Sequence, residues 1–161
     1  NVNIRDHAGM TARQHLQTLS ITNRDEYKIM VTGGSGQSGK SALVLQFARN
    51  EFSDEYEQSL FTDSFRRYVD IDGHKCILDV MDCPGHDSLH IWDDWAREND
   101  IFIFVFSITD MEDFQSVLDV ERLKRFAYAK EDMLFKHPVI LVGSKSDLEV
   151  ERVVSKQDAE K

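Results

Sequence analysis

The chain has 161 residues, which is enough for one domain with a hydrophobic core and too few for two domains of ordinary size. Its composition, 41% hydrophobic and 30% charged, is that of a globular protein and excludes a fibrous or disordered chain. The formal net charge of −10 at pH 7 argues against a nucleic-acid partner, because binding to the phosphate backbone depends on clustered cations.

Membrane, export and disulfide signals are weak. The longest uncharged apolar run covers residues 101–108, far short of the roughly 20 residues that a membrane span needs. Residues 1–25 contain no apolar stretch, so we expect no secretory signal there. The two cysteines, Cys76 and Cys83, provide neither a disulfide framework nor a paired metal-ligand spacing. These features favour a reducing, cytoplasmic location.

The apolar pattern predicts the elements in chain order. Residues 1–25 lack a strong pattern and are predicted to form an extension or linker, whereas residues 26–161 form the domain. The predicted strands are 27–32, 65–71, 75–81, 101–108 and 138–142, and the predicted helices are 40–50, 90–99, 111–128 and 155–161.

Two local signals sharpen this order. Asp72-Gly73 between two strands is typical of a two-residue hairpin turn, and Asp110 is predicted to cap the helix that begins at Met111. Strands that alternate with helices, plus one hairpin, predict an α/β fold, a three-layer sandwich around a mostly parallel sheet with one antiparallel strand. Ligands of such sheets bind beyond the carboxyl ends of the strands.

The most specific motif follows the first predicted strand. Residues 34–41 match the pattern Gly-x-x-x-x-Gly-Lys-Ser, and an amphipathic helix follows them. Glycines let successive backbone N–H groups surround a phosphate, and the helix points its positive end at the same anion. Lys40 would reach the β- and γ-phosphates, and the Ser41 hydroxyl would ligate Mg²⁺. This context favours the phosphate loop of P-loop NTPases over a flexible turn. The predicted nucleotide-binding residues here are Gly34, Ser35, Gly36, Gln37, Ser38, Gly39, Lys40, Ser41 and Ala42.

Two further loops follow predicted strands. Asp82-Cys83-Pro84-Gly85 comes after the second hairpin strand, and Gly143-Ser144-Lys145-Ser146-Asp147-Leu148 comes after strand 138–142. Each aspartate alone would be an ordinary loop residue. The order and placement of all three loops favour one nucleotide site.

Several short motifs carry a family resemblance. They are Lys40-Ser41-Ala42-Leu43 with Gln46-Phe47, Asp54-Glu55-Tyr56, Asp72-Gly73 with Cys76-Ile77-Leu78-Asp79, and Leu141-Val142-Gly143. With the three loops, they make the chain resemble the Ras superfamily of small GTPases, and the Ras, Rap and Rheb-type branch most of all. The resemblance covers residues 27–161 and stops before the last strand and helix of the family's domain, so we expect this chain to lack those elements and the Ser-Ala-Lys loop that helps to hold guanine.

The resemblance implies a site for GTP or GDP with Mg²⁺. Asp82 would hold Mg²⁺ through water, the Gly85 N–H would bind the γ-phosphate, and the Phe52 ring would pack on guanine. Asp147 would accept hydrogen bonds from guanine N1–H and the 2-amino group. A switch hydroxyl would ligate Mg²⁺ and sense the γ-phosphate, and both Ser59 and Thr62 fit this role because one residue is inserted after Ser59. Outside the phosphate loop, the implied nucleotide-binding residues are Phe52, Ser59, Thr62, Gly85, Ser144, Lys145, Asp147 and Leu148; the metal ligands are Ser41, Ser59, Thr62 and Asp82; the catalytic residues are His86, Lys40 and Gly85.

Three residues depart from the family's pattern. Ser144 stands where the family has asparagine, and one hydroxyl cannot supply both a donor to the base and an acceptor to the phosphate loop. We therefore expect weaker guanine binding. Gln37 replaces a glycine of the phosphate loop, and His86 replaces the glutamine that orients the attacking water, which predicts slow hydrolysis. Cys-Pro-Gly-His at 83–86 is also found in translational GTPases, but their segment between the phosphate loop and this motif is generally longer.

The sequence therefore predicts a Ras-type molecular switch with low intrinsic GTPase activity. Effector, exchange-factor or activating proteins would bind residues of about 54–65 and 86–97, and nucleic acid is not an expected partner. Membrane association would need a C-terminal segment beyond this chain, so the expected location is the cytoplasm or the cytoplasmic face of a membrane. One alternative, motivated by Ser144, Gln37 and His86, is a pseudo-GTPase subunit of a larger assembly. Another, an ATP-using P-loop enzyme, is disfavoured by Asp147.

The remaining motifs favour structural interpretations. His86 and His90 are four residues apart, but no third ligand has a convincing spacing, so a solvated pair is favoured over a metal site. Arg122-Leu123-Lys124-Arg125 is interpreted as a solvated helix face. Trp92 and Trp95 fit two interpretations equally, as core anchors or as a partner-binding surface.

Overall fold

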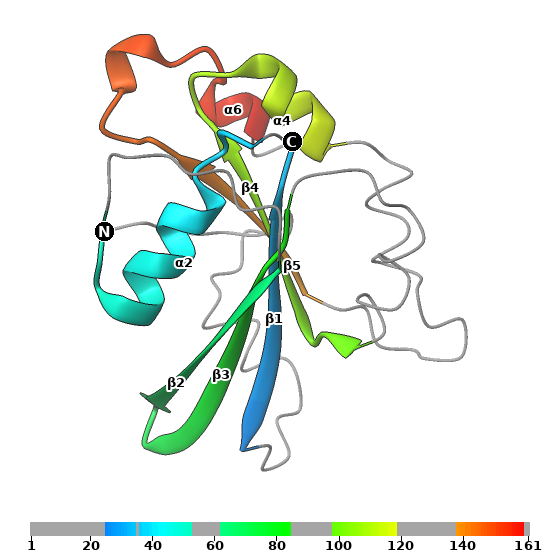
Figure 1. Ribbon diagram of the computed structural model, residues 1–161. Coiled ribbons are helices and arrows are strands. Elements are labelled where there is room, and N and C mark those ends of the chain that lie inside the picture. The colour runs from blue at the N-terminus through cyan, green and yellow to red at the C-terminus, as the bar shows by residue number, and fades with distance from the viewer. Residues whose placement is uncertain (1–24, 35, 53–61, 85–97, 119–137, 160–161) are drawn as a thin grey trace.

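A five-stranded sheet forms the framework of the protein (Figure 1). The computed structural model describes residues 25–34, 36–52, 62–84, 98–118 and 138–159. In chain order its elements are β1 (Glu26–Gly33), α2 (Lys40–Arg49), β2 (Asp63–Ile71), β3 (His74–Asp82), β4 (Ile101–Ser107), α4 (Met111–Val117), β5 (Val139–Ser144), the 3-10 turn η1 (Glu149–Glu151) and α6 (Lys156–Ala159). The five predicted strands and the helix predicted at 40–50 are confirmed.

The strand order is β2-β3-β1-β4-β5. β1 pairs in parallel with β3 and β4, β4 pairs in parallel with β5, and only the β2–β3 pair is antiparallel. The predicted α/β fold with a mostly parallel sheet and one antiparallel strand is therefore confirmed. Because the four parallel strands share one direction, their carboxyl ends lie at one edge, where β3 ends at Asp82 and β5 ends at Ser144.

The β2–β3 hairpin closes as its sequence predicts. Asp72 and Gly73 both have positive φ, 55° and 85°, which is the combination that a type I′ turn needs. The Gly73 N–H donates to Asp70 Oδ1 at 2.8 Å, and Ile71 faces His74 across the turn. This turn fixes the register that aligns Asp63 at the start of β2 with Asp82 at the end of β3.

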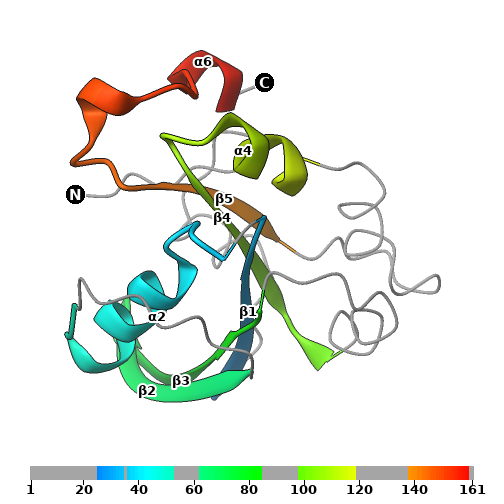
Figure 2. The same cartoon turned by 45° about the horizontal axis from the view of Figure 1, so that its top comes forward.

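Helices cover both faces of the sheet (Figure 2). On one face α2 packs Val44 against a cluster that contains Ile29 and Val31 of β1. On the other face α4 and α6 meet the rings of β4, and Phe106 and Phe114 lie 4.8 Å apart between ring centroids. The apolar run of β4 is buried because both faces are covered. Among the described residues, no helix combines the length and apolar character of a membrane span.

The helix that follows β4 is shorter than predicted. Asp110 caps it as expected, because its Oδ1 accepts the N–H groups of Glu112 and Asp113 at 3.0 Å each. The helix ends at Val117, and the backbone of Leu118, with φ −82° and ψ 2°, is no longer helical. The rest of the predicted helix, 119–128, lies outside the described residues, as do residues 90–97 of the helix predicted at 90–99.

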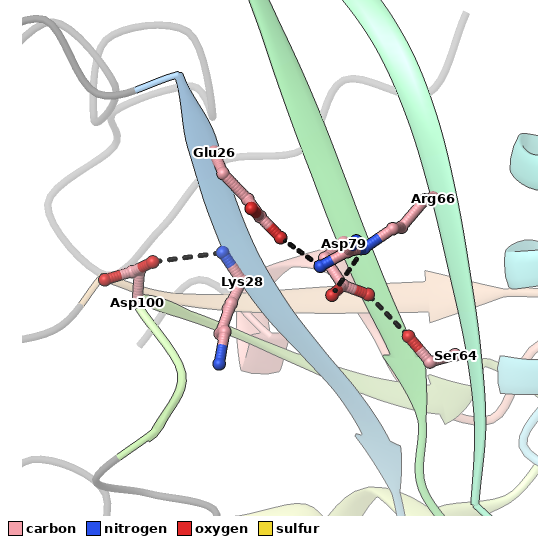
Figure 3. Close-up of polar contacts among 6 residues, drawn as sticks. All are labelled: Glu26, Lys28, Ser64, Arg66, Asp79 and Asp100. Atoms are coloured by element: carbon pink, nitrogen blue, oxygen red, sulfur yellow. Dashed lines mark hydrogen bonds and ion pairs between the residues drawn. The ribbon is translucent and has the colours of Figure 1, made fainter.

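Polar contacts hold the three neighbouring strands β2, β3 and β1 together near the amino end of β1 (Figure 3). The Arg66 guanidinium bridges Glu26, at 2.6 Å, and Asp79, at 3.2 Å. Both carboxylates raise the pKa of Arg66, mainly through the Asp79 hydrogen bond. On the other side of β1, the Lys28 N–H donates to Asp100 Oδ2 at 3.0 Å. Such exposed pairs specify strand register more than they add stability.

Candidate functional site

The phosphate-loop sequence joins β1 to α2 at the carboxyl edge of the sheet (Figure 2). Gly39, the residue before α2, has a φ of +80°, a backbone conformation that favours glycine. A Cβ on Gly39 would also lie 3.2 Å from Ser144 Oγ. Lys40 then begins α2 and is only 6% exposed. The loop therefore presents a buried lysine and the free N–H groups of a helix start at one place.

Asp82 lies beside this helix start, at the end of β3. Its side chain is buried, and burial raises the pKa of Asp82 above its ordinary value. The hydrogen bond from Ser41 and the charge of Lys40 lower that pKa, and Asp63 raises it. Asp82 Oδ1 is buried and has no hydrogen-bond partner. Ser41, Lys40 and Asp82 are thus brought together, as the sequence predicts they would be.

This arrangement suits Mg²⁺. An orphaned carboxylate oxygen beside a serine hydroxyl offers the hard oxygen ligands that this cation prefers. The part of the chain that the structure describes holds no group of three or more His, Cys, Asp or Glu side chains that could bind a metal alone. A cation here would therefore depend on phosphate oxygens and water for its remaining ligands, which is the usual manner of Mg²⁺ in nucleotide sites.

Ser144 joins the third loop to the phosphate loop. Its Oγ donates to the backbone carbonyl of Ser38 at 2.6 Å. The sequence-based prediction that the phosphate loop would need an acceptor from Ser144 is wrong, because the hydroxyl donates a hydrogen bond to it. A carbonyl needs a donor, and the hydroxyl has a single proton to give. Ser144 therefore links the third loop to the phosphate loop, and its one proton is used in that hydrogen bond.

The turn after Ser144 displays the other residues of the third loop. Lys145 has a φ of 58° and its carbonyl accepts the Leu148 N–H at 2.9 Å, which closes a tight turn. Lys145 and Leu148 are half-buried, and Asp147 is exposed to solvent beside the carboxyl edge of the sheet.

The remaining predicted residues divide into those that the structure describes and those that it does not. Phe52, just beyond α2, is 71% exposed, which leaves its ring free to contact a ligand. Gln37 and Thr62 are exposed, and Ala42 is half-buried in α2. The predicted residues that lie outside the described part of the chain are Ser35, Ser59, Gly85 and His86. The surfaces expected to bind partners, 54–65 and 86–97, fall largely in the same category.

One contact to the phosphate loop was missed by sequence reasoning. Asp113 of α4 packs directly on Gly34, since a Cβ on that glycine would lie 2.5 Å from the Asp113 backbone oxygen and 2.6 Å from its Oδ1. The only sequence signal was an acidic residue three positions after a helix cap, which is common in helices without any site.

Comparison with known proteins decides the family. The sequence profile of the Ras family matches residues 28–161. The chain is 40% identical over 134 residues to Ras-related protein O-RAL of Diplobatis ommata, covering 83% of this chain and 63% of the relative. It is 36% identical over 136 residues to a Ras-like protein of Laccaria bicolor, with 84% and 62% covered. It is 38% identical over 138 residues to Ras-like protein 1 of Saccharomyces cerevisiae, with 83% and 41% covered.

The chain belongs to the Ras family. It spans about three fifths of the length of the first two relatives. The predicted resemblance and the predicted fold are thereby confirmed. The roles of individual site residues stay predictions, because the family match assigns none of them.

This Ras family chain also carries a buried thiol in the second loop. Cys83 follows Asp82, is fully buried, and donates its backbone N–H to the Val31 carbonyl at 2.9 Å. Burial, and secondarily the charge of Asp82, raise the pKa of Cys83 to about 12. The thiol is therefore protonated and unreactive at neutral pH, so Cys83 packs the loop rather than acting as a nucleophile.

Proposed function

We propose that this chain is a guanine-nucleotide-dependent switch that binds GTP and GDP with Mg²⁺ and hydrolyses GTP slowly. The observation that carries the proposal is the cluster of buried Lys40 and Asp82 with half-buried Ser41, in which one Asp82 oxygen has no hydrogen-bond partner. A buried cation and an unsatisfied carboxylate oxygen are costly to maintain unless a ligand completes them. A phosphate and its Mg²⁺ would do so.

The base would bind at the third loop. Ser144 ties that loop to the carbonyl of Ser38, so the two loops share one rigid link. Asp147 is exposed and able to meet a ligand. A carboxylate there selects guanine because it accepts from N1–H and the 2-amino group, a pair of donors that adenine lacks. Phe52 offers an exposed ring for the face of the base.

Hydrolysis would depend on positioning and electrostatics. Lys40 and the N–H groups at the start of α2 would stabilise charge that develops on the phosphates. Mg²⁺, when bound to Ser41 and near Asp82, would neutralise charge on the same phosphate oxygens. His86 would replace the family's glutamine at the attacking water, which favours a slow reaction.

Switching would involve the loops that contact the γ-phosphate. Ser59 or Thr62, and Gly85, would be ordered by GTP and released after hydrolysis. Effector, exchange-factor or activating proteins would read residues of about 54–65 and 86–97. The protein would act in the cytoplasm or on the cytoplasmic face of a membrane, with residues 1–25 as an extension and 26–161 as the GTPase domain.

Nucleotide release tests the proposal directly. The purified protein is heated, and the supernatant is separated by anion exchange; we expect GDP or GTP near one equivalent. Lys40→Ala should lose the bound nucleotide. Lys28→Ala removes an exposed lysine of β1 and should retain it. Absence of nucleotide, together with no binding of a fluorescent GDP analogue, would refute the switch. Bound nucleotide without any turnover would favour the pseudo-GTPase.

Base selectivity gives a second test. Asp147→Asn replaces an acceptor pair by one donor and one acceptor, so it should weaken GDP binding and favour xanthosine diphosphate, which has a carbonyl in place of the 2-amino group. Unpaired buried groups are unfavourable by about 1–3 kcal/mol, so the preference should shift by roughly tenfold or more. Competition with a fluorescent GDP analogue measures it. Equal loss of both nucleotides would mean that Asp147 does not read the base.

A further inference from the structure

A buried acidic residue lies against the phosphate loop. Asp113 is the third residue of α4 and is only 2% exposed. Its Oδ2 accepts the Ser107 N–H at 2.7 Å, and its own N–H donates to Asp110 Oδ1 at 3.0 Å. The carboxylate is therefore held between the end of β4 and the cap of α4, in a fixed position.

The second carboxylate oxygen faces the loop. A Cβ on Gly34 would lie 2.6 Å from Asp113 Oδ1, 2.5 Å from the Asp113 backbone oxygen and 3.1 Å from Ser116 Oγ. No side chain fits at this position, so the Gly34 backbone sits directly on α4. Among the described residues, Oδ1 therefore lies against the Gly34 backbone, at the start of the loop that would surround the phosphates.

Charge at this position acts on phosphates. Inside a protein the effective dielectric constant is about 20, and one charge pair at about 10 Å then changes affinity by a factor on the order of ten. Salt screening weakens this less for a buried carboxylate than for an exposed one. GTP carries about one negative charge more than GDP near neutral pH, so a buried anion behind the loop penalises GTP more.

We propose that Asp113, from its place behind Gly34, lowers the affinity of the nucleotide site for GTP relative to GDP through its negative charge. This inference depends on the proposed function. Asp113 sets how much phosphate charge the loop tolerates, while Lys40 supplies the attraction. The two buried groups have opposite charge and oppose each other in binding.

The test compares two neutralising substitutions on one helix turn. Asp113→Asn keeps the shape and an acceptor for the Ser107 N–H. Glu112→Gln removes the same charge from the adjacent, exposed residue. Affinities for GDP and for a non-hydrolysable GTP analogue are measured with Mg²⁺. We expect Asp113→Asn to raise the ratio of GTP-analogue to GDP affinity by about threefold or more, and Glu112→Gln to leave it unchanged.

Each other outcome overturns the inference. If Asp113→Asn changes the affinities for GDP and the GTP analogue equally, Asp113 has only a structural role. If Glu112→Gln changes the ratio of the two affinities as much as Asp113→Asn does, the effect is one of overall charge and not of this position. If Asp113→Asn does not fold, as judged by its melting temperature, Asp113→Ser makes the same comparison with a smaller neutral side chain. If the native protein binds neither nucleotide, the proposed function fails and this inference with it.

Discussion

Replacing Ser144 by asparagine should strengthen GDP binding by about tenfold. In the native protein the single hydroxyl proton of Ser144 is donated to the Ser38 carbonyl at 2.6 Å. The edge of guanine that carries the acceptor N7 then receives no donor from this side chain. An asparagine amide has two protons, one for the Ser38 carbonyl and one for the base. Gly39, which has no side chain, is the neighbour of Ser144 on the phosphate loop, and a Cβ there would lie 3.2 Å from Ser144 Oγ.

The magnitude follows from one buried acceptor. An unpaired buried acceptor is unfavourable by about 1–3 kcal/mol, and about 1.4 kcal/mol corresponds to tenfold in affinity. The assay is calorimetric titration of nucleotide-free protein with GDP and with 7-deaza-GDP, which has carbon in place of N7. Native protein should bind both equally. The Ser144→Asn variant should prefer GDP by about tenfold.

Ser144→Ala is the matched control, because it removes the link to Ser38 without offering a new donor. It should weaken GDP and 7-deaza-GDP to the same extent. If Ser144→Asn leaves GDP affinity unchanged, the guanine site is not built around this loop. If native protein already discriminates against 7-deaza-GDP, another donor reads N7 and the reasoning from the hydroxyl is wrong.

Much of the fold could be predicted because its signals are local. The Asp72-Gly73 pair requires a tight hairpin, and the run at 101–108 has no polar face, so it belongs to a buried strand. The end of α4 could not be predicted in this way. Apolar residues continue past Val117 at helical spacing, so the pattern does not predict that the backbone stops being helical at Leu118.

In the candidate site, too, the residues of a local motif could be predicted, whereas contacts between distant segments could not. The phosphate loop is one contiguous motif whose glycine and lysine have fixed geometric roles, so Gly39 and Lys40 were predictable. Ser144 was recognised as a departure, but a hydroxyl can donate or accept, and only the position of the Ser38 carbonyl decides. The contact of Asp113 with Gly34 depends on how α4 packs against a distant loop, which no local pattern specifies.

Three further predictions address the metal, the buried carboxylate and turnover. Ser41→Asn should remove a metal ligand, so its affinity for GTP should lose its dependence on Mg²⁺; equal affinities with and without Mg²⁺ in both proteins would exclude Ser41 as a ligand. Because burial raises the pKa of Asp82 in the folded state, folding binds a proton, and stability falls as pH rises from its ordinary value of 3.8 through the raised pKa. Asp82→Asn should therefore raise the melting temperature of nucleotide-free protein at pH 7 and give no gain below that ordinary value; no gain at pH 7 would contradict the burial argument.

Turnover should be slow because the two nitrogens of an imidazole ring point apart, whereas glutamine can accept from the attacking water and donate toward the γ-phosphate with one planar group. Pro84 restricts the same loop, and a misplacement of about 1 Å can lower a rate on the order of 10²-fold. His86→Gln should release phosphate from preloaded GTP faster than native protein in a single-turnover assay. Slower release would mean that the imidazole itself assists the attacking water, and that this loop works as in the translational GTPases that share Cys-Pro-Gly-His.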